Sequence, residues 1–215
     1  MNKNKVISVC LWLAALVICG LGIALTTKAS FGVGAVQGPA YAIYLKLSEY
    51  IPGFTFGISS YLTEALFLVI MCILIKHFQL SYVLSFVTAF LLGVVLDFFR
   101  GILGMEISAG MGIRVLQFSA GTLCIAFAVA CYFRTDMPLE VWELFVKKVS
   151  EHFGLDTARF KWFFDICMLF IGGILCIVFF RRFRMDIIGI GTIVSAVTIG
   201  PLAGLFGTIL DRWIR

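Results

Sequence analysis

The sequence predicts an all-α, polytopic membrane protein with six transmembrane helices, arranged as two inverted three-helix repeats with short broken or interfacial helices. The first observation is composition: 61% of the 215 residues are hydrophobic and 13% are charged, with a mean hydropathy of +1.06. A soluble domain usually carries about 25% charged residues, so too few charges remain here to cover a water-facing surface. The second and third observations are six long apolar segments and a sequence motif that occurs twice. We expect a single transmembrane domain over residues 1–215.

Six segments are long enough to cross a bilayer, which takes roughly 20 apolar residues. They are 6–25, 58–75, 80–99, 112–133, 162–180 and 187–210. The first could be mistaken for a signal peptide, because Lys3 and Lys5 precede it. Its apolar run of about 20 residues exceeds the 7–15 of a signal peptide, and five further spans follow, so we expect an uncleaved helix.

The charged residues indicate topology and argue against other functions. With a cytoplasmic N-terminus, ten of the 17 Lys and Arg residues fall on the inside, so the positive-inside rule favours both termini in the cytoplasm. No basic patch is interleaved with aromatic residues, so no nucleic-acid partner is expected. All seven cysteines lie in apolar segments without a Cys-x-x-Cys pair, which is typical of small buried hydrophobes. We therefore expect no cofactor and no metal.

The two halves of the chain repeat one another. Residues 85–93 (SFVTAFLLG) align without a gap on residues 192–200 (TIVSAVTIG), sharing Val, Ala and Gly. In each half a first helix leads into an interruption of about 30 residues and then into a helical hairpin. Because each half has an odd number of spans, repeat two (about 112–213) must enter the membrane opposite to repeat one (about 6–105). Such inverted repeats are typical of secondary transporters.

The aligned helices carry small residues every four positions: Ser81, Ser85, Ala89, Gly93 and Asp97 on one, Thr192, Ala196, Gly200 and Gly204 on the other. Small residues at this spacing allow close helix packing, within the protein or against a partner. The alternative is functional, with a polar path lined by Thr88, Thr192, Ser195 and Thr198. Pro201, after Gly200, cannot donate to the carbonyl of Val197, so we expect a kink there.

Each interruption contains a short helical segment too short to span. Gly34, Gln37, Gly38 and Pro39 introduce 37–51, and Asp136 and Pro138 introduce 139–153, where Asp136 is expected to cap the helix. Each segment is either an interfacial helix or a re-entrant one whose first amides face a substrate anion. For 139–153 we favour the interfacial helix, because Trp142, Phe145, Val146, Val149 and Phe153 oppose Glu140, Glu143, Lys147 and Glu151.

Ionisable residues inside spans are costly and therefore functional candidates. Glu64 is the deepest, and we expect it to serve as a coupling or substrate-binding carboxylate; Asp165, Asp97 and Arg114 lie nearer the ends. The candidate substrate-binding residues are Glu64, Gln37, Asp136, Thr88, Thr192, Ser195 and Thr198. The expected helix breaks are Gly34, Gly38, Pro39, Pro138, Gly200 and Pro201.

Several glycine motifs resemble the YitT/YczE-type family of bacterial integral membrane proteins. They are Gly-Leu-Gly-Ile-Ala-Leu at 20–25 and Gly-Ile-Gly-Thr at 189–192, followed by Gly200-Pro201. The resemblance covers nearly the whole chain. It implies a location in the bacterial cytoplasmic membrane and a role in transport, and it supplies no catalytic residues. The sequence departs from the family pattern where Ala40-Tyr41 follow Gly38-Pro39 in place of an acid, and where Asp136 precedes its proline.

The predicted function is a small transporter or permease for an unidentified small polar solute, with the lipid bilayer as its surroundings. One alternative is a substrate-binding subunit of a multi-component uptake system, docked through small-residue helix faces such as Gly20-xxx-Ala24; such faces would also suit a homodimer. Another is a non-transporting accessory or regulatory membrane protein. An enzyme is not expected, because the chain has no His-Glu-x-x-His or Gly-x-Ser-x-Gly motif.

Overall fold

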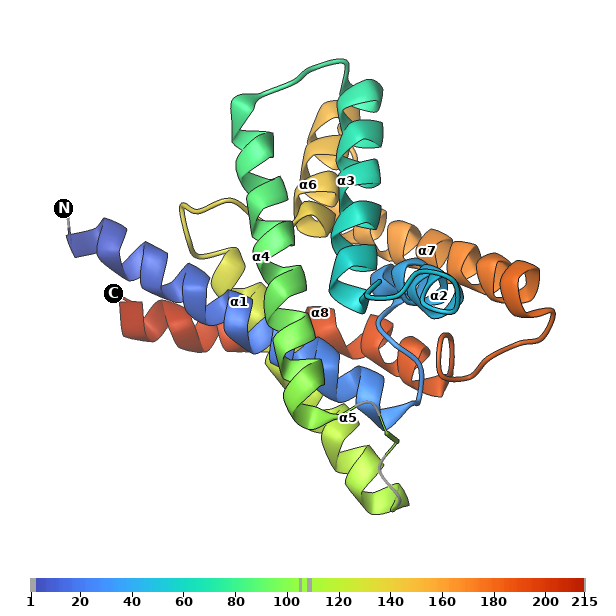
Figure 1. The fold of residues 1–215 in the computed structure, drawn as a ribbon. Helices are drawn as coiled ribbons and strands as arrows, with labels where there is room; N and C mark the ends of the chain where they lie inside the picture. The colour runs from blue at the N-terminus through green and yellow to red at the C-terminus, as the bar shows by residue number, and fades with distance from the viewer. Residues whose placement is uncertain (1–2, 105, 108–109, 215) are drawn as a thin grey trace.

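The computed structural model describes residues 3–104, 106–107 and 110–214, and in these residues all regular secondary structure is helical (Figure 1). Six helices are long: α1 (Lys3–Ala29), α3 (Phe56–Ile75), α4 (Leu80–Leu103), α5 (Met111–Tyr132), α7 (Thr157–Phe180) and α8 (Ile190–Ile214). Between them lie two short helices, α2 (Gly38–Leu47), which follows the 3-10 turn η1 (Ala35–Gln37), and α6 (Val141–Phe153).

The six long helices are each long and apolar enough to cross a membrane, which confirms the six predicted spans and indicates a multi-pass membrane protein. Most begin or end a few residues from the predicted limits. Helix α7 starts five residues before the predicted segment because the Asp156 carboxylate caps it, accepting a hydrogen bond from the Arg159 amide at 2.9 Å. Large apolar side chains such as Phe170 and Ile174 point outward, as a lipid-facing surface requires.

Helices α1 and α5 form an antiparallel pair at the centre of the fold. A Cβ atom on Gly22 would lie 2.8 Å from the carbonyl oxygen of Gly121, so the two backbones are in direct contact. At one end the Arg114 guanidinium donates to the Ala29 carbonyl at 2.8 Å. At the other end the Asp136 amide donates to the Ser8 hydroxyl at 2.8 Å. These contacts fix the antiparallel direction.

Helix α4 lies against α1, and α8 lies against α5. Gly20 of α1 faces Val95 of α4, and Ala24 is buried as well. The small-residue face that the sequence offers for a partner is therefore covered by the protein's own helix. At the end of α8, Asp211 forms an ion pair with Arg134 at 2.7 Å, close to the start of α1. The two chain ends thus lie on the same side of the molecule (Figure 1).

The two helical hairpins, α3–α4 and α7–α8, differ in how tightly they close. Gly57 of α3 and Gly93 of α4 meet backbone to backbone, and Asp97 accepts a hydrogen bond from the Gly57 amide at 2.9 Å. The small-residue face of α4 therefore packs within the first half of the chain. On α8, by contrast, a Cβ atom on Gly200 or Gly204 would meet no atom within 4 Å. The equivalent face of α8 is open.

The short helices each pack against a long helix from the other half of the chain. A Cβ atom on Gly172, in the middle of α7, would lie 3.4 Å from Gly38 and Pro39 at the start of α2. The Trp142 ring at the start of α6 lies 5.1 Å from Phe67, near the middle of α3. Both short helices therefore begin inside the bundle, beside the midpoint of a long helix.

Helix α6 differs from its prediction in length. Its apolar face is buried against α3 and α7, with only Phe153 of that face exposed, whereas Lys147 and Glu151 on its polar face are exposed. It begins at Val141 instead of 139, because the Pro138 carbonyl accepts a hydrogen bond from the Trp12 indole at 3.1 Å and holds the preceding segment extended. The prediction that Asp136 caps this helix is wrong for the same reason.

Candidate binding cavity

A cavity of about 940 Å³ lies between α1, α5, α6, α7 and α8. It extends to Arg134, which pairs with Asp211 near the chain ends, and its lining is also exposed at Glu151, Thr157, Gly200 and Gly204. Its wall is apolar along α1, α5 and α8, and it is charged along α6 and the start of α7. The charged lining residues of that wall are Glu140, Glu143, Lys147, Glu151, Lys161 and Asp165. The cavity is therefore large enough for a small solute and has one polar wall.

The starts of both short helices line this cavity, through Gln37 on one side and Glu140 on the other. Behind Gln37, the Ser60 hydroxyl lies 3.1 Å from Gln37 Oε1 and 3.2 Å from Glu64 Oε1. Glu64 is fully buried, and its second carboxyl oxygen, Oε2, has no hydrogen-bond partner among the described residues. The sequence places Glu64 and Gln37 far apart, and the fold brings them to one polar cluster at the base of the cavity.

Glu140 is 5% exposed and precedes the first residue of α6. Burial raises the pKa of its carboxyl from 4.5 to about 8; the charge of Glu143 pushes the pKa the same way, and Lys161 opposes it. The ammonium of Lys161 lies 3.3 Å from both Glu143 and Asp165, so those two acids already share it. This wall therefore carries more acidic than basic groups.

The other predicted site residues are distributed over several environments. Of the predicted polar path, Ser195 lines the cavity, together with Gly34, Gly200 and Pro201 from the expected helix breaks. Helix α8 continues through Pro201 as one helix to Ile214.

The remaining predicted residues serve local structure. Thr88 is fully buried and donates to Leu84 at 3.2 Å, with the Pro138 carbonyl at 3.5 Å. Thr192 accepts a hydrogen bond from the Gly189 amide at 3.2 Å and so caps the start of α8. Thr198 donates to the carbonyl one turn back in α8. Asp136 is exposed, outside the cavity.

Sequence reasoning missed Glu140 and Ser60 as members of the cluster. Glu140 was assigned to the solvent-facing side of an amphipathic helix, whereas it lies at the buried start of that helix. A partial signal was present: Glu140 follows the proline of its interruption, Pro138, by two residues, and Gln37 precedes the proline of the other interruption, Pro39. Among the described residues, no group of three His, Cys, Asp or Glu side chains is placed to hold a metal ion.

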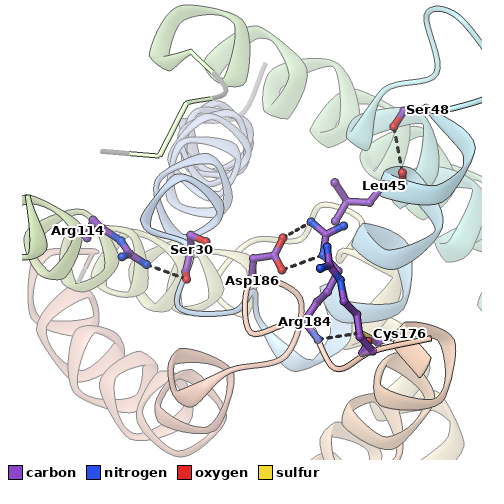
Figure 2. A network of polar contacts seen from close by, with 8 residues as sticks. Ser30, Leu45, Ser48, Arg114, Cys176, Arg184 and Asp186 are labelled. Carbon is purple, nitrogen blue, oxygen red and sulfur yellow. Dashed lines mark hydrogen bonds and ion pairs between the residues drawn. The ribbon is translucent and has the colours of Figure 1, made fainter. Parts of the chain in front are cut away.

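A second, smaller pocket of about 220 Å³ lies at the opposite end of the α1–α5 pair. The Arg100 guanidinium lies 4.6 Å from the centre of the Tyr44 ring, and Arg184 pairs with Asp186 at 2.6 Å (Figure 2). Burial raises the pKa of Tyr41 in this pocket to about 12. Its charges are mostly basic, opposite to those of the large cavity.

The family described as a family of unknown function, DUF6198, matches residues 6–208 of the chain. No curated protein and no solved structure matches.

Proposed function

The chain belongs to this family of unknown function, and we propose that it is a secondary transporter for a small polar solute, built from two inverted repeats. The observation that carries the proposal is the meeting of two short helices, one from each half of the chain, at the base of a single cavity. Transporters with inverted repeats bind substrate at such a junction, where helices are discontinuous.

The helix pairs support the inverted repeat. Helix α1 of the first half pairs with α5 of the second in an antiparallel manner. The contact of α1 with α4 has its counterpart in that of α5 with α8, and α2 against α7 has its counterpart in α6 against α3. One two-fold rotation that exchanges the halves accounts for all of these pairs. We place the start of each short helix at mid-depth in the membrane, as a re-entrant helix.

The two pockets fit alternating access. The large cavity is bounded by the end of α5, the first half of α8 and α6, and the small pocket is bounded by the ends of α1 and α4 with α2. They differ in size because the α3–α4 hairpin is closed at Gly57 and Gly93, whereas Gly200 of α8 faces open space. Closing α8 onto α7 while α4 leaves α3 would exchange the two pockets.

The distribution of Lys and Arg gives the orientation that we propose. The positive-inside rule favours both termini in the cytoplasm of a bacterial cell, and in this proposal the large cavity faces the cytoplasm. Kinship with the YitT/YczE-type proteins is part of this proposal, supported by the glycines of the 189–192 motif. Gly189 and Gly191 lie against the backbone of Phe31, where a side chain would not fit.

The test is a thermal-shift screen of the purified protein against small polar solutes, followed by flux of any stabilising solute into proteoliposomes. A ligand that binds only the folded state raises the melting temperature. Gly200→Trp fills the cavity and should abolish both effects, whereas Ile193→Trp, at a lipid-facing position of the same helix outside the cavity lining, should retain them.

Other outcomes would redirect the proposal. Binding without flux would favour a substrate-binding subunit that needs a partner. A stable protein that responds to no solute would favour an accessory or regulatory role. Equal behaviour of the two Trp variants would show that the cavity is not the binding site.

A further inference from the structure

We propose that Glu64 and Glu140 form a shared proton-binding site at the base of the cavity, which holds one proton at neutral pH and exchanges it with the cavity through Glu140. The inference rests on the proposed function in one respect, because in a transporter this proton would be the coupling ion. The proton site itself can be tested without any transported solute.

The first support is the burial of two acids near one another. Glu64 is 0% and Glu140 5% exposed, and the charge of Glu140 lies close enough to act on Glu64. They flank the contact between Phe67 and Trp142, whose rings lie 5.1 Å apart. Ionising both carboxylates in one buried site is costly, because burial removes most of the solvation that would offset their repulsion. One proton between them removes that repulsion.

The second support is the surroundings of the two acids. Among the described residues around them, no cation is free to neutralise the pair. The thiol of Cys19 on α1, the phenol of Tyr132 on α5, the hydroxyl of Ser60 on α3 and the amide of Gln37 are neutral. The charged groups are Glu143 on α6 and Lys161 on α7. Lys161 lies 3.3 Å from Glu143 and 3.3 Å from Asp165, so its single charge is shared by two other acids.

The third support is the hydrogen bonding of Ser60. Its hydroxyl lies within hydrogen-bonding distance of two acceptors, Gln37 Oε1 at 3.1 Å and Glu64 Oε1 at 3.2 Å. One hydroxyl proton can serve only one of them. A proton on Glu64 completes the chain, since Glu64 then donates to Ser60 and Ser60 donates to Gln37.

The two acids have different access to water. Glu140 lines the cavity, whereas Glu64 does not. A proton can therefore enter or leave through Glu140, and Glu64 holds it away from water. The pKa of Glu140, raised by burial to about 8, lies close to physiological pH, as an exchanging group requires.

Infrared difference spectroscopy of the purified full-length protein tests the site directly. As the pH rises from about 6 to about 10, across the Glu140 pKa of about 8, the wild type should lose the carbonyl stretch of one protonated carboxylic acid per chain. The double variant Glu64→Gln, Glu140→Gln should lack this band. Each single variant should move its midpoint down by about one pH unit or more, because the remaining acid has lost a like charge.

The matched control is Glu49→Gln, which removes an acid from an exposed ion pair with Lys46 far from the cavity and should leave the band unchanged. If Glu64→Gln does not fold, Ser60→Ala replaces it. Loss of the hydroxyl contact should then shift the frequency of the band. A band that survives in the double variant, or a midpoint that either single variant leaves in place, overturns the proposal.

The nature of the ligand is tested by exchanging sodium for choline at constant ionic strength. A proton site gives the same titration in both salts. If sodium removes the band at neutral pH, the pair binds a metal cation and the proton site is overturned. Absence of flux together with an intact titrating band would instead refute the transport proposal alone.

Discussion

The backbone contact between α1 and α5 gives a sharp test of the fold. A Cβ atom on Gly121 would lie 2.7 Å from the Gly22 carbonyl oxygen and 3.0 Å from the Thr26 amide nitrogen. Both are backbone atoms that cannot rotate away, so Gly121→Ala must push the two central helices apart.

The magnitude follows from two opposing effects. Overpacking a tight contact costs typically about 1–3 kcal/mol, and the fixed backbone places this case near the upper end. Replacing glycine by alanine inside a helix returns about 1 kcal/mol through higher helix propensity. We expect a net loss of about 2 kcal/mol in the free energy of unfolding, or a melting temperature lower by about 4–8 °C for a chain of this size.

The assay is thermal unfolding of the purified variants in detergent, with Gly112→Ala as the matched control on the same helix. A Cβ atom on Gly112 meets no atom within 4 Å, so this variant should be as stable as the wild type or slightly more stable. A Gly121→Ala protein that melts at or above the temperature of the control would refute the close α1–α5 contact, and with it the axis of the proposed repeat.

Three further predictions concern single side chains. The pKa of Glu140 is about 8 in the folded protein and 4.5 in the unfolded chain. Because the folded protein binds this proton more tightly, the free energy of unfolding should fall as the pH rises between these two values, by at most about 1.4 kcal/mol per pH unit. The Glu140→Gln variant should lose less stability than the wild type at the upper end of this window, near the Glu140 pKa of about 8. Asp97→Asn weakens the acceptor of the Gly57 amide at the start of α3 and should cost about 1–2 kcal/mol in thermal unfolding; an unchanged melting temperature would contradict this role. Trp12→Phe leaves the Pro138 carbonyl without its indole donor and should cost about 1 kcal/mol; proteolysis of the segment before α6 should become faster, and equal rates would argue against the tether.

The candidate site shows how far sequence reasoning reached. Glu64 was identified because a carboxyl deep in an apolar span is costly, and Gln37 because glycine and proline interrupt the helix beside it; the structure joins both through Ser60. Glu140 was misplaced because a hydrophobic face predicts that one side of a helix is buried, but does not reveal that the helix begins inside the bundle. The tether from Trp12 to Pro138, which fixes that start, joins residues 126 positions apart.

By itself the sequence determined the class of the protein, its six spans and the two short helices between them, because these depend on local composition, length and the placement of proline and glycine. The tertiary structure alone decided which half each short helix packs against, that the small-residue face of α4 is closed while that of α8 is open, and that Glu140 lies near Glu64. These depend on contacts between distant segments, and in an apolar chain many helix faces offer similar small residues. Only close backbone fit, as at Gly22 with Gly121 and Gly57 with Gly93, selects among them.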